Sequence, residues 1–247
     1  MSDQNILVCV LPCVPLRAEP NDRSEQVSQI LSGEIVTKTK SCEGNWIKIQ
    51  SQEDMYEGYV DPRHFHVFTS SLKNRLIVNV DSVWDRGSSK SVAYCGSYVY
   101  LENDLYSIGD FHFENFDTGR PNVSFVDSAI EFLGTPYHWG GKTKCGIDCS
   151  GLTQICARLF GVNLQRDASQ QAQEGLSVDW EEREVGDLAF YKNKGGKITH
   201  VGILMNDDQI IHASGEVRVD GITYEGIIHS KTGEISHEFS HIIRMEF

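Results

Sequence analysis

The sequence lacks any apolar run long enough to cross a membrane, and it carries little positive charge. A membrane-spanning helix needs about 20 consecutive apolar residues, and no segment of the 247 residues approaches that length. The 22 lysines and arginines are outnumbered by 35 aspartates and glutamates, so the net charge is −13. Nucleic acid and anionic membranes attract basic proteins, so neither is expected as a partner. The excess of acid suits a cationic or amine-bearing ligand.

The chain also lacks the even set of cysteines that is typical of a disulfide framework. Its seven cysteines are scattered along the sequence, which indicates reduced thiols in a cytosol. Residues 6–16 are as apolar as a secretory signal. However, Asp3 rather than a basic segment precedes them, and Pro12 and Pro15 interrupt them. We therefore expect a buried first strand there and a cytoplasmic protein.

Up to about residue 120 the pattern predicts short strands separated by turns, because β-branched and aromatic residues alternate with Gly and Pro breaks. Segments 14–40 and 81–103 share a weak repeat of polar turn residues, then Gly, then a strand. This repeat predicts two small β barrels, over residues 1–70 and 71–121. One longer β domain is the alternative.

After Pro121 the pattern changes to helices followed by strands. Apolar residues recur at helical spacing from Val126 to Leu133 and from Leu152 to Phe160, and Gly134 and Gly161 end these two stretches. Further segments follow, a short helix at 168–173 and strands at 186–192, 198–206 and 209–214. Helices followed by an antiparallel sheet predict an α+β domain over residues 122–247.

Cys149 stands where a loop becomes the second of these helices. Backbone N–H groups in a first helical turn are unpaired, and the helix dipole favours negative charge there. The position therefore predicts a lowered thiol pKa and a reactive thiolate. Cys156 lies on the apolar face of the same helix and is expected in the core.

A cysteine nucleophile needs a base within hydrogen-bond reach and a group that orients this base. His200 and His212 are candidates on consecutive strands. If residues 205–209 form a five-residue loop, Leu204 faces Ile210, and the two histidines are diagonal neighbours on one face. A two-residue turn would place them on opposite faces. The other histidines are expected to be structural: His64, His66, His112, His138, His229, His237 and His241.

Cys145 and Cys149 together with the two histidines suggest a zinc site as an alternative. Structural zinc more often uses tight cysteine pairs, and the sequence has no second pair. A disulfide between Cys145 and Cys149 is disfavoured by a reducing compartment. We expect no metal ion and no cofactor.

Residues 134–154, GTPYHWGGKTKCGIDCSGLTQ, resemble the nucleophile motif of the NlpC-type cysteine peptidases, which cleave bacterial cell-wall peptides on a papain-like fold. Segments GDLAFY, ITHVGILM and IIHASG resemble the family's later motifs in order and spacing. The first half resembles, more loosely, the bacterial SH3 domains that often precede this peptidase domain. The implied fold is an α+β, papain-like NlpC-type domain over 122–247, preceded by one or two small SH3-like β barrels.

The resemblance implies that Cys149 is the nucleophile, that His200 is the general base and that His212 orients the base. N–H groups at the helix start would meet the oxyanion. Many relatives carry a serine where Ala168 stands, so a contact to the substrate is expected either to be missing or to be taken over by Ser169. The residues expected to contact substrate in this half are Tyr137, Trp139, Asp148, Ser150 and Ser169.

Relatives with SH3-like domains require a free L-alanine amine and cut after γ-D-glutamate, before the diamino acid. The resemblance thus implies murein peptides with a free N-terminal L-Ala as substrates, in cytoplasmic recycling. Asp148 is the expected partner of the amine. The turn at residues 52–59 is expected to form a wall that keeps longer peptide chains out of the site. Its candidate substrate contacts are Tyr56 and the acids Glu53, Asp54 and Glu57. An ordinary solvated turn is the alternative.

Two other functions remain open at this point. One is a different acyl-transfer enzyme on the same fold, such as an amidase or a lipid acyltransferase. The other is a non-catalytic protein that binds wall peptides, which the presence of both a nucleophile and a base disfavours.

Overall fold

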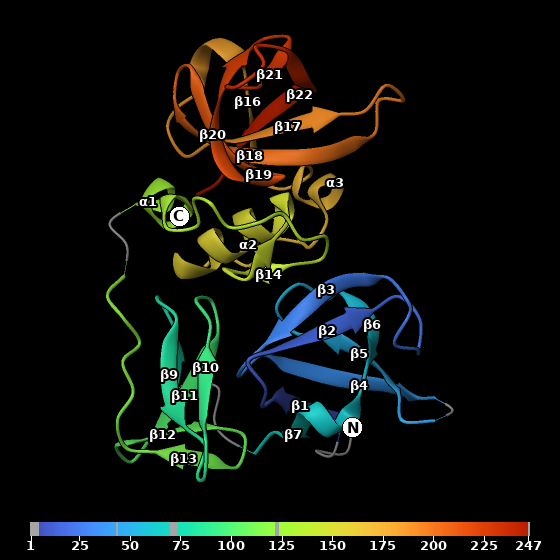
Figure 1. Cartoon of the computed structure of the whole chain (residues 1–247), viewed down its shortest axis with the longest axis vertical. Helices are drawn as coiled ribbons and strands as arrows, with labels where there is room; N and C mark the ends of the chain where they lie inside the picture. Colours follow the sequence, from blue (N-terminus) through green and yellow to red (C-terminus); the bar gives the residue numbers. More distant parts are fainter. Residues whose placement is uncertain (1–4, 43, 70–73, 122–123, 247) are drawn as a thin grey trace. The chain divides into compact units, whose positions relative to one another are not determined.

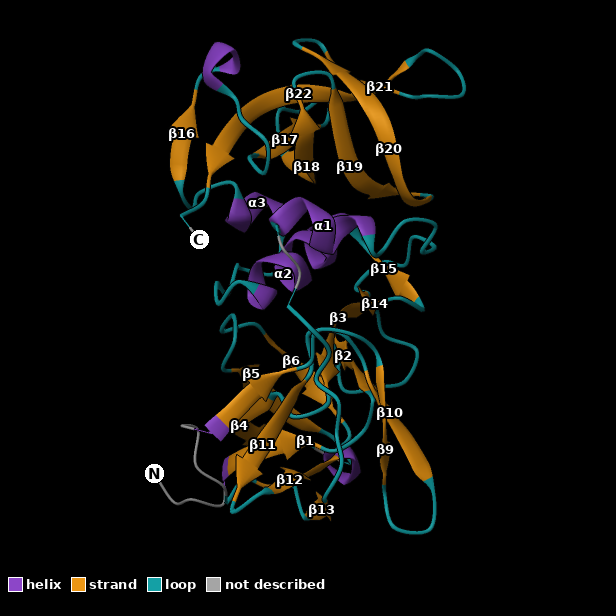
Figure 2. Ribbon diagram, turned by 90° about the vertical axis from the view of Figure 1, so that its left-hand side faces the viewer, coloured by secondary structure: helices purple, strands orange, loops and turns teal. Residues whose placement is uncertain are grey.

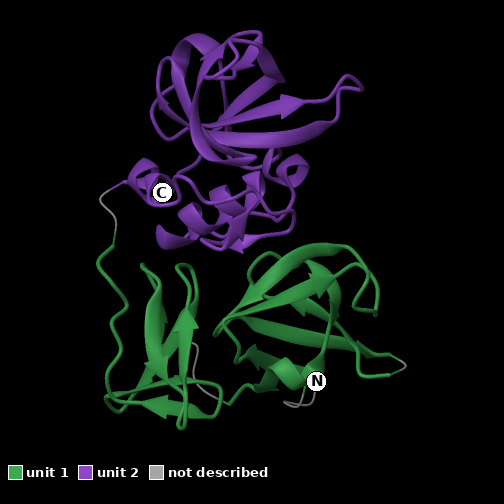
Figure 3. Ribbon diagram, in the orientation of Figure 1, with its two compact units in different colours: residues 1–121 green, residues 122–247 purple. Residues whose placement is uncertain are grey.

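The computed structural model describes residues 5–42, 44–69, 74–121 and 124–246. The chain divides into two compact units, residues 1–121 and residues 122–247 (Figure 3). The predicted boundary between residues 70 and 71 lies outside the described residues. Among the described residues, no helix is long and apolar enough to cross a membrane.

The first part of unit 1 is one antiparallel sheet of seven strands in the order β3-β2-β6-β5-β4-β1-β7 (Figure 1). Its inward residues form an apolar core that includes Leu16, Ile30 and Ile49. The apolar segment 6–16 forms strands, as predicted, but Pro12 lies in the break between β1 and β2. The strands are β1 (Ile6–Cys9), β2 (Cys13–Arg17), β3 (Gln26–Leu31), β4 (Ile35–Ser41), β5 (Ile47–Ser51), β6 (Glu57–Val60) and β7 (Phe65–Val67), with a 3-10 turn at Pro62–His64.

The second part of unit 1 is a four-stranded sheet, β13-β12-β11-β8, together with the hairpin β9-β10. The buried Trp84 and Tyr100 of this part pack in one hydrophobic cluster with Val8, Val10 and Ile35 of the first part. This second cluster therefore packs the two parts of unit 1 together. The strands are β8 (Arg75–Ile77), β9 (Ser82–Asp85), β10 (Lys90–Ala93), β11 (Tyr98–Glu102), β12 (Leu105–Ile108) and β13 (Phe111–Phe113).

In the described part of unit 2, residues 124–246, three helices pack against a closed barrel. Strands β22-β17-β18-β19-β20-β21 are hydrogen-bonded in that order, and β21 also pairs with β22, which closes the ring. The short strand β16 pairs with β22 as well. Figure 2 shows the helices on one side of the barrel, where α2 and α3 contact β18.

The elements of unit 2 lie close to where the sequence predicts them. The helices are α1 (Phe125–Ile130), α2 (Cys149–Leu159) and α3 (Ala168–Gln171). The strands are β14 (Lys142–Thr143), β15 (Gly146–Ile147), β16 (Leu176–Val178), β17 (Leu188–Lys192), β18 (Ile198–Asn206), β19 (Gln209–Ser214), β20 (Glu216–Thr223), β21 (Gly226–Ile228) and β22 (Ile235–Arg244), with a 3-10 turn at Trp180–Glu182.

The hairpin between β18 and β19 corrects one prediction. Leu204 faces Ile210, as the predicted register requires. The five-residue loop is wrong, because β18 extends to Asn206 and β19 begins at Gln209. A register shift between Leu204 and Asn206 places one extra residue in β18. Such a β-bulge reverses the side of every following residue, so a two-residue turn keeps both histidines on one face.

Candidate active site

Cys149 is the first residue of α2, and Asp148 caps the helix. The Asp148 side chain accepts a hydrogen bond from the Gly151 N–H at 2.7 Å, which satisfies one unpaired donor of the first turn. The loop before the helix packs so closely that a Cβ on Gly151 would lie 2.2 Å from the Gly141 carbonyl oxygen. The glycines of the motif therefore fix where the helix begins, and with it the position of the thiol.

The electrostatics of Cys149 overturn the prediction of a lowered pKa. The residue is only 6% exposed, and burial raises the pKa of its thiol to about 12, with a further contribution from the charge of Asp148. Hydrogen bonds from the backbone N–H groups of Val201 and Ser150, and the charge of Arg166, act in the opposite direction but are outweighed. The resting group is therefore a neutral thiol, held next to the residue that follows His200.

The two candidate histidines meet in a buried relay on the barrel. Nε2 of His200 lies 2.8 Å from Nδ1 of His212, and both residues are buried. Nε2 of His212 in turn lies 3.0 Å from Oδ2 of Asp220. Asp220 also accepts hydrogen bonds from Arg218 Nε at 2.9 Å and from the Ser230 N–H at 2.9 Å.

Asp220 fixes which nitrogen of each ring carries the proton. Burial alone would raise the pKa of Asp220, but hydrogen bonds from His212, Ser230 and Arg218 lower it below its ordinary value. An ionised carboxylate only accepts hydrogen bonds, so Nε2 of His212 donates to it and Nδ1 of His212 is left as an acceptor. Nε2 of His200 then donates to His212. The lone pair of His200 Nδ1 remains available to take the thiol proton.

Burial also keeps the base neutral. It lowers the pKa of His200 well below its ordinary value, and His237 and His212 add to this effect. Together with the raised pKa of Cys149, this makes the resting pair an uncharged thiol and imidazole. Such a pair reacts by proton transfer to the base during attack.

Sequence reasoning missed three residues of this cluster. Arg218 and Asp220 lie two residues apart on β20, which pairs with β19. An Arg and an Asp at this spacing are too common in sequences to indicate a catalytic site. His237 was expected to be structural only, yet its ring stacks on that of His200 with a centroid separation of 4.0 Å. His200, His212 and His237 bring ligand nitrogens within 4.8 Å of one another.

The structure gives Asp148 a buried ion pair. Arg166 donates from Nη1 to Oδ1 at 3.0 Å and from Nη2 to Oδ2 at 2.5 Å, and the Gly140 N–H donates to Oδ2 at 2.8 Å. The side chains of both partners are at most 5% exposed. A substrate ammonium would have to compete with Arg166 for this carboxylate, so the role of Asp148 as amine partner stays a prediction.

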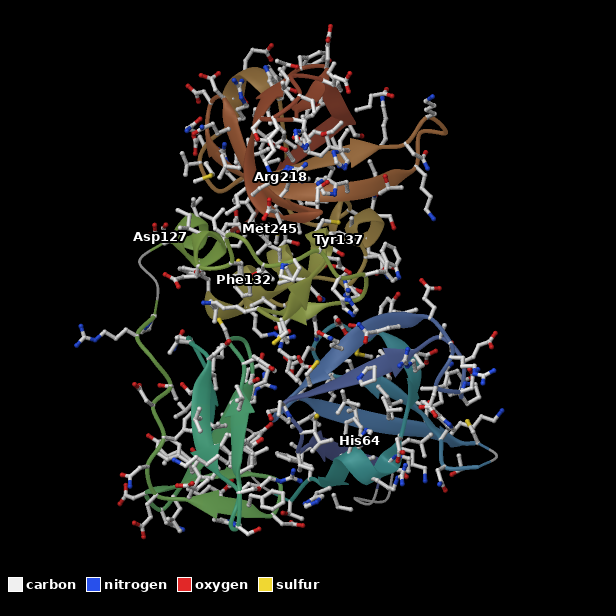
Figure 4. All side chains as sticks on the ribbon, viewed as in Figure 1. His64, Asp127, Phe132, Tyr137, Arg218 and Met245 are labelled. Carbon is white, nitrogen blue, oxygen red and sulfur yellow. The ribbon has the colours of Figure 1, made fainter. Side chains whose placement is uncertain are left out.

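The other predicted contacts of unit 2 are Tyr137 and Trp139 on the loop between α1 and β14, Ser150 on α2 and Ser169 on α3. Tyr137 lies in the helical layer of the unit, and its N–H bonds the Gly215 carbonyl at the β19–β20 turn; Figure 4 labels it and Arg218 of the barrel. Burial raises the pKa of Tyr137, and the charges of Cys149 and Asp148 add to this.

Three of these side chains differ in exposure. Trp139, on the same loop as Tyr137, is 59% exposed. Ser150 is buried, and its hydroxyl accepts a hydrogen bond from Arg166 at 2.8 Å. Ser169 is partly exposed on α3.

The predicted wall residues have partners inside unit 1. Glu53 pairs with Arg75 at 2.6 Å, and Glu57 pairs with Lys48 at 2.6 Å. Asp54 accepts a hydrogen bond from the Tyr56 N–H at 3.1 Å, which is an Asx-turn contact. Tyr56 is partly buried against the core of the seven-stranded sheet. Their contacts with a substrate stay a prediction.

Comparison with known proteins places this geometry in a family. Residues 134–235 match the NlpC/P60 family, and residues 16–65 match the bacterial dipeptidyl-peptidase SH3 domain. The chain belongs to the NlpC/P60 family of cell-wall cysteine peptidases. The resemblance of both halves, and with it the predicted fold class, is thereby confirmed.

Individual relatives differ in how much of the chain they match. A gamma-D-glutamyl-L-lysine dipeptidyl-peptidase of Bacillus cereus is 33% identical over 108 residues, which is 42% of this chain and only 32% of that relative. Dipeptidyl-peptidase 6 of Lysinibacillus sphaericus is 28% identical over 250 residues, 84% of this chain and 88% of the relative. The crystal structure of an NlpC/P60 family protein from B. cereus has a TM-score of 0.73 at 18% identity, covering 97% of this chain and 99% of that one.

Proposed function

We propose that this NlpC/P60 protein cleaves the bond between γ-D-glutamate and the following L-diamino acid in murein peptides that begin with a free L-alanine. The observation that carries the proposal is the alignment with dipeptidyl-peptidase 6 of L. sphaericus across both units. The gamma-D-glutamyl-L-lysine dipeptidyl-peptidase of B. cereus, matched over 108 residues, supports the same bond type.

The relay supplies both proton transfers of an acyl-transfer reaction. The Cys149 thiol gives its proton to Nδ1 of His200 as the sulfur attacks the γ-carbonyl carbon of D-glutamate. His212 stabilises the imidazolium that forms, because its Nδ1 accepts a hydrogen bond from Nε2 of His200. Asp220 in turn accepts a hydrogen bond from Nε2 of His212. The imidazolium then returns the proton to the amine of the diamino acid as the peptide bond breaks, which leaves an L-Ala-γ-D-Glu thioester on Cys149.

The second half of the reaction runs through the same base. His200 takes a proton from water, and the hydroxide oxygen attacks the thioester carbonyl. Collapse of this intermediate breaks the carbon–sulfur bond and returns the proton to the thiolate, which releases L-Ala-γ-D-Glu. N–H groups at the start of α2, which have no carbonyl partner one turn earlier, are suited to stabilise the oxyanion in both steps.

Recognition of the free amine and a cytoplasmic location are further parts of the proposal. The substrate would carry an ammonium group, which suits a chain with a net charge of −13. Among the described residues, none of the seven cysteines forms a disulfide, which fits a reducing compartment. A role in recycling murein peptides follows from these two features.

Incubation of the purified protein with matched peptides tests this function. L-Ala-γ-D-Glu-L-Lys and its meso-diaminopimelate counterpart should yield L-Ala-D-Glu and the free diamino acid by mass spectrometry. The N-acetylated forms should be cleaved at least about 100-fold more slowly, since an ammonium–carboxylate contact is worth a few kcal/mol. Equal cleavage of both forms would refute the amine requirement, and binding without cleavage would support a wall-peptide binding protein instead.

A further inference from the structure

The ring of His237 lies flat against the ring of the base. The two imidazoles are separated by 4.0 Å between centroids and inclined by 22°. His237 comes from β22, whereas His200 comes from β18, and β17 runs between these strands. The stack therefore joins two strands that are not hydrogen-bonded neighbours. The relay from His200 to His212 and Asp220 uses no atom of His237.

The ring of His237 is itself held in place. Ser236 Oγ lies 2.9 Å from His237 Nδ1 and 3.3 Å from the Ile227 carbonyl oxygen. Because a carbonyl only accepts, the hydroxyl donates to Ile227, and its lone pair accepts from His237 Nδ1–H. This bond fixes both the tautomer of His237 and the plane of its ring.

The rings of His212 and Tyr191 also contact His200, but neither is parallel to its plane. The ring of His212 is nearly perpendicular to that of His200, at 84°, as expected for two rings joined edge to edge by a hydrogen bond. The ring of Tyr191, on β17, lies 6.0 Å from His200 and is inclined by 51°. Only His237, among the described residues with a ring contact to His200, lies parallel to it and so restricts rotation out of its plane.

We propose that His237 is a positioning residue for the catalytic base. Its stacked imidazole fixes the plane of the His200 ring, so that Nε2 donates to His212 and the lone pair of Nδ1 is held in one orientation. The proposal rests on the proposed function only in that His200 is the base.

A metal ion shared by the three histidines is the competing interpretation of this cluster. A ligating imidazole binds metal through a lone pair in the plane of its ring. The planes of His200 and His237 are stacked rather than convergent, so one ion cannot lie close to both planes. In addition, Nε2 of His200 and Nδ1 of His212 already share a proton at 2.8 Å.

Stacking also keeps water from one face of His200. The titratable and charged groups that face this pair come from β17, β19 and β20: Tyr191, His212, Arg218 and Asp220. On α2, the Cys149 thiol accepts a hydrogen bond from the N–H of Val201, which follows His200. Burial is the main reason that the pKa of His200 is lowered. Opening its face to water should raise this pKa toward the ordinary histidine value of about 6.5. Because the base must be neutral to act, the acid limb of kcat/KM should then move to higher pH.

Three variants in the full-length protein separate stacking from mere filling of space. His237→Phe keeps a flat ring, His237→Leu keeps apolar volume without a plane, and His237→Ala removes both. His112→Phe is the control, since His112 is exposed in unit 1. Two readouts are needed: proton NMR of the hydrogen-bonded imidazole N–H of His200, which needs no substrate, and the pH profile of kcat and KM. Thermal melting of each variant identifies loss of fold.

His237→Phe and the control should keep the downfield N–H signal and kcat within about 2-fold. In His237→Leu and His237→Ala the N–H signal should broaden or vanish. The value of kcat should fall about 10- to 100-fold with little change in KM, because a misplaced catalytic group costs that much. The acid limb of kcat/KM should move to higher pH. A folded Leu or Ala variant that keeps both the signal and the acid limb overturns the proposal. So does a Phe variant as impaired as Ala. Because the NMR signal needs no peptide, failure of the proposed substrate would leave this test intact.

Discussion

At the scale of single residues, the relay explains how a buried cysteine can act as a nucleophile without a resting thiolate. Burial raises the pKa of Cys149 and lowers that of His200. The ion pair of the two groups therefore forms only during attack. Asp220, which also accepts a hydrogen bond from Arg218, determines which nitrogen of His212, and therefore of His200, donates in the relay.

The neutral resting pair predicts the ultraviolet absorbance of the free protein. Thiolate absorbance near 240 nm should show no difference between the protein and Cys149→Ser at pH 7, because the thiol pKa is raised to about 12. The difference should appear only as the pH approaches that value. Cys145→Ser is the matched control, since this cysteine lies on the preceding loop and is exposed. A thiolate step below pH 7 that Cys149→Ser abolishes would contradict the account.

Asp220→Asn should be more damaging than its size suggests. The amide can donate to Nε2 of His212, which would reverse both tautomers and leave His200 Nδ1 protonated in the resting protein. We expect kcat to fall by about 10²–10⁴-fold, the usual contribution of general acid–base catalysis, with little change in KM. His200→Ala should cost at least as much, and His212→Ala less, because it only loosens the base. Steady-state kinetics measure all three, and equal, negligible effects would show that the relay is structural.

At the scale of elements, the sequence predicts most of unit 2 because its signals are local. Helical spacing, the glycines at 134 and 161, and the alternation along 198–206 all act within one segment. The partners of β18 and β22 depend instead on barrel closure, so the stacking of His237 on His200 has no local signal. The buried state of Cys149 is also a tertiary property, which is why the helix-start argument misjudged its pKa.

The start of α2 should tolerate no side chain at position 151. A Cβ at Gly151 would lie 2.2 Å from a backbone oxygen and 3.0 Å from Asp148 Oδ1. We expect Gly151→Ala to lower the free energy of unfolding by about 1–3 kcal/mol and to lower kcat by displacing Cys149. Gly221→Ala is the control, because the nearest atom to its Cβ is 3.8 Å away. Melting curves and kinetics that do not distinguish the two variants would disprove this role for the glycine.

At the scale of the whole molecule, the two compact units raise the question of what unit 1 does for the peptidase. The sequence predicts that unit 1 supplies a wall that stops longer chains, with Tyr56 as a contact. Residues 122–247 alone, if circular dichroism shows them folded, should accept N-acetylated peptides and bind the free tripeptide more weakly. In the full chain, Tyr56→Phe should raise KM for the free tripeptide, whereas Tyr59→Phe should not. Unchanged preference for free amines in a folded truncated protein would show that the catalytic unit alone recognises the terminus.

The central claim is that Cys149 forms a thioester with the dipeptide half of the substrate. Rapid mixing with L-Ala-γ-D-Glu-L-Lys, acid quenching and mass spectrometry of the peptides that contain cysteine test it most directly. We predict one adduct of L-Ala-γ-D-Glu on Cys149, the same adduct in Cys145→Ala, and neither adduct nor product in a folded Cys149→Ala protein. Cleavage of the peptide by Cys149→Ala would contradict the account.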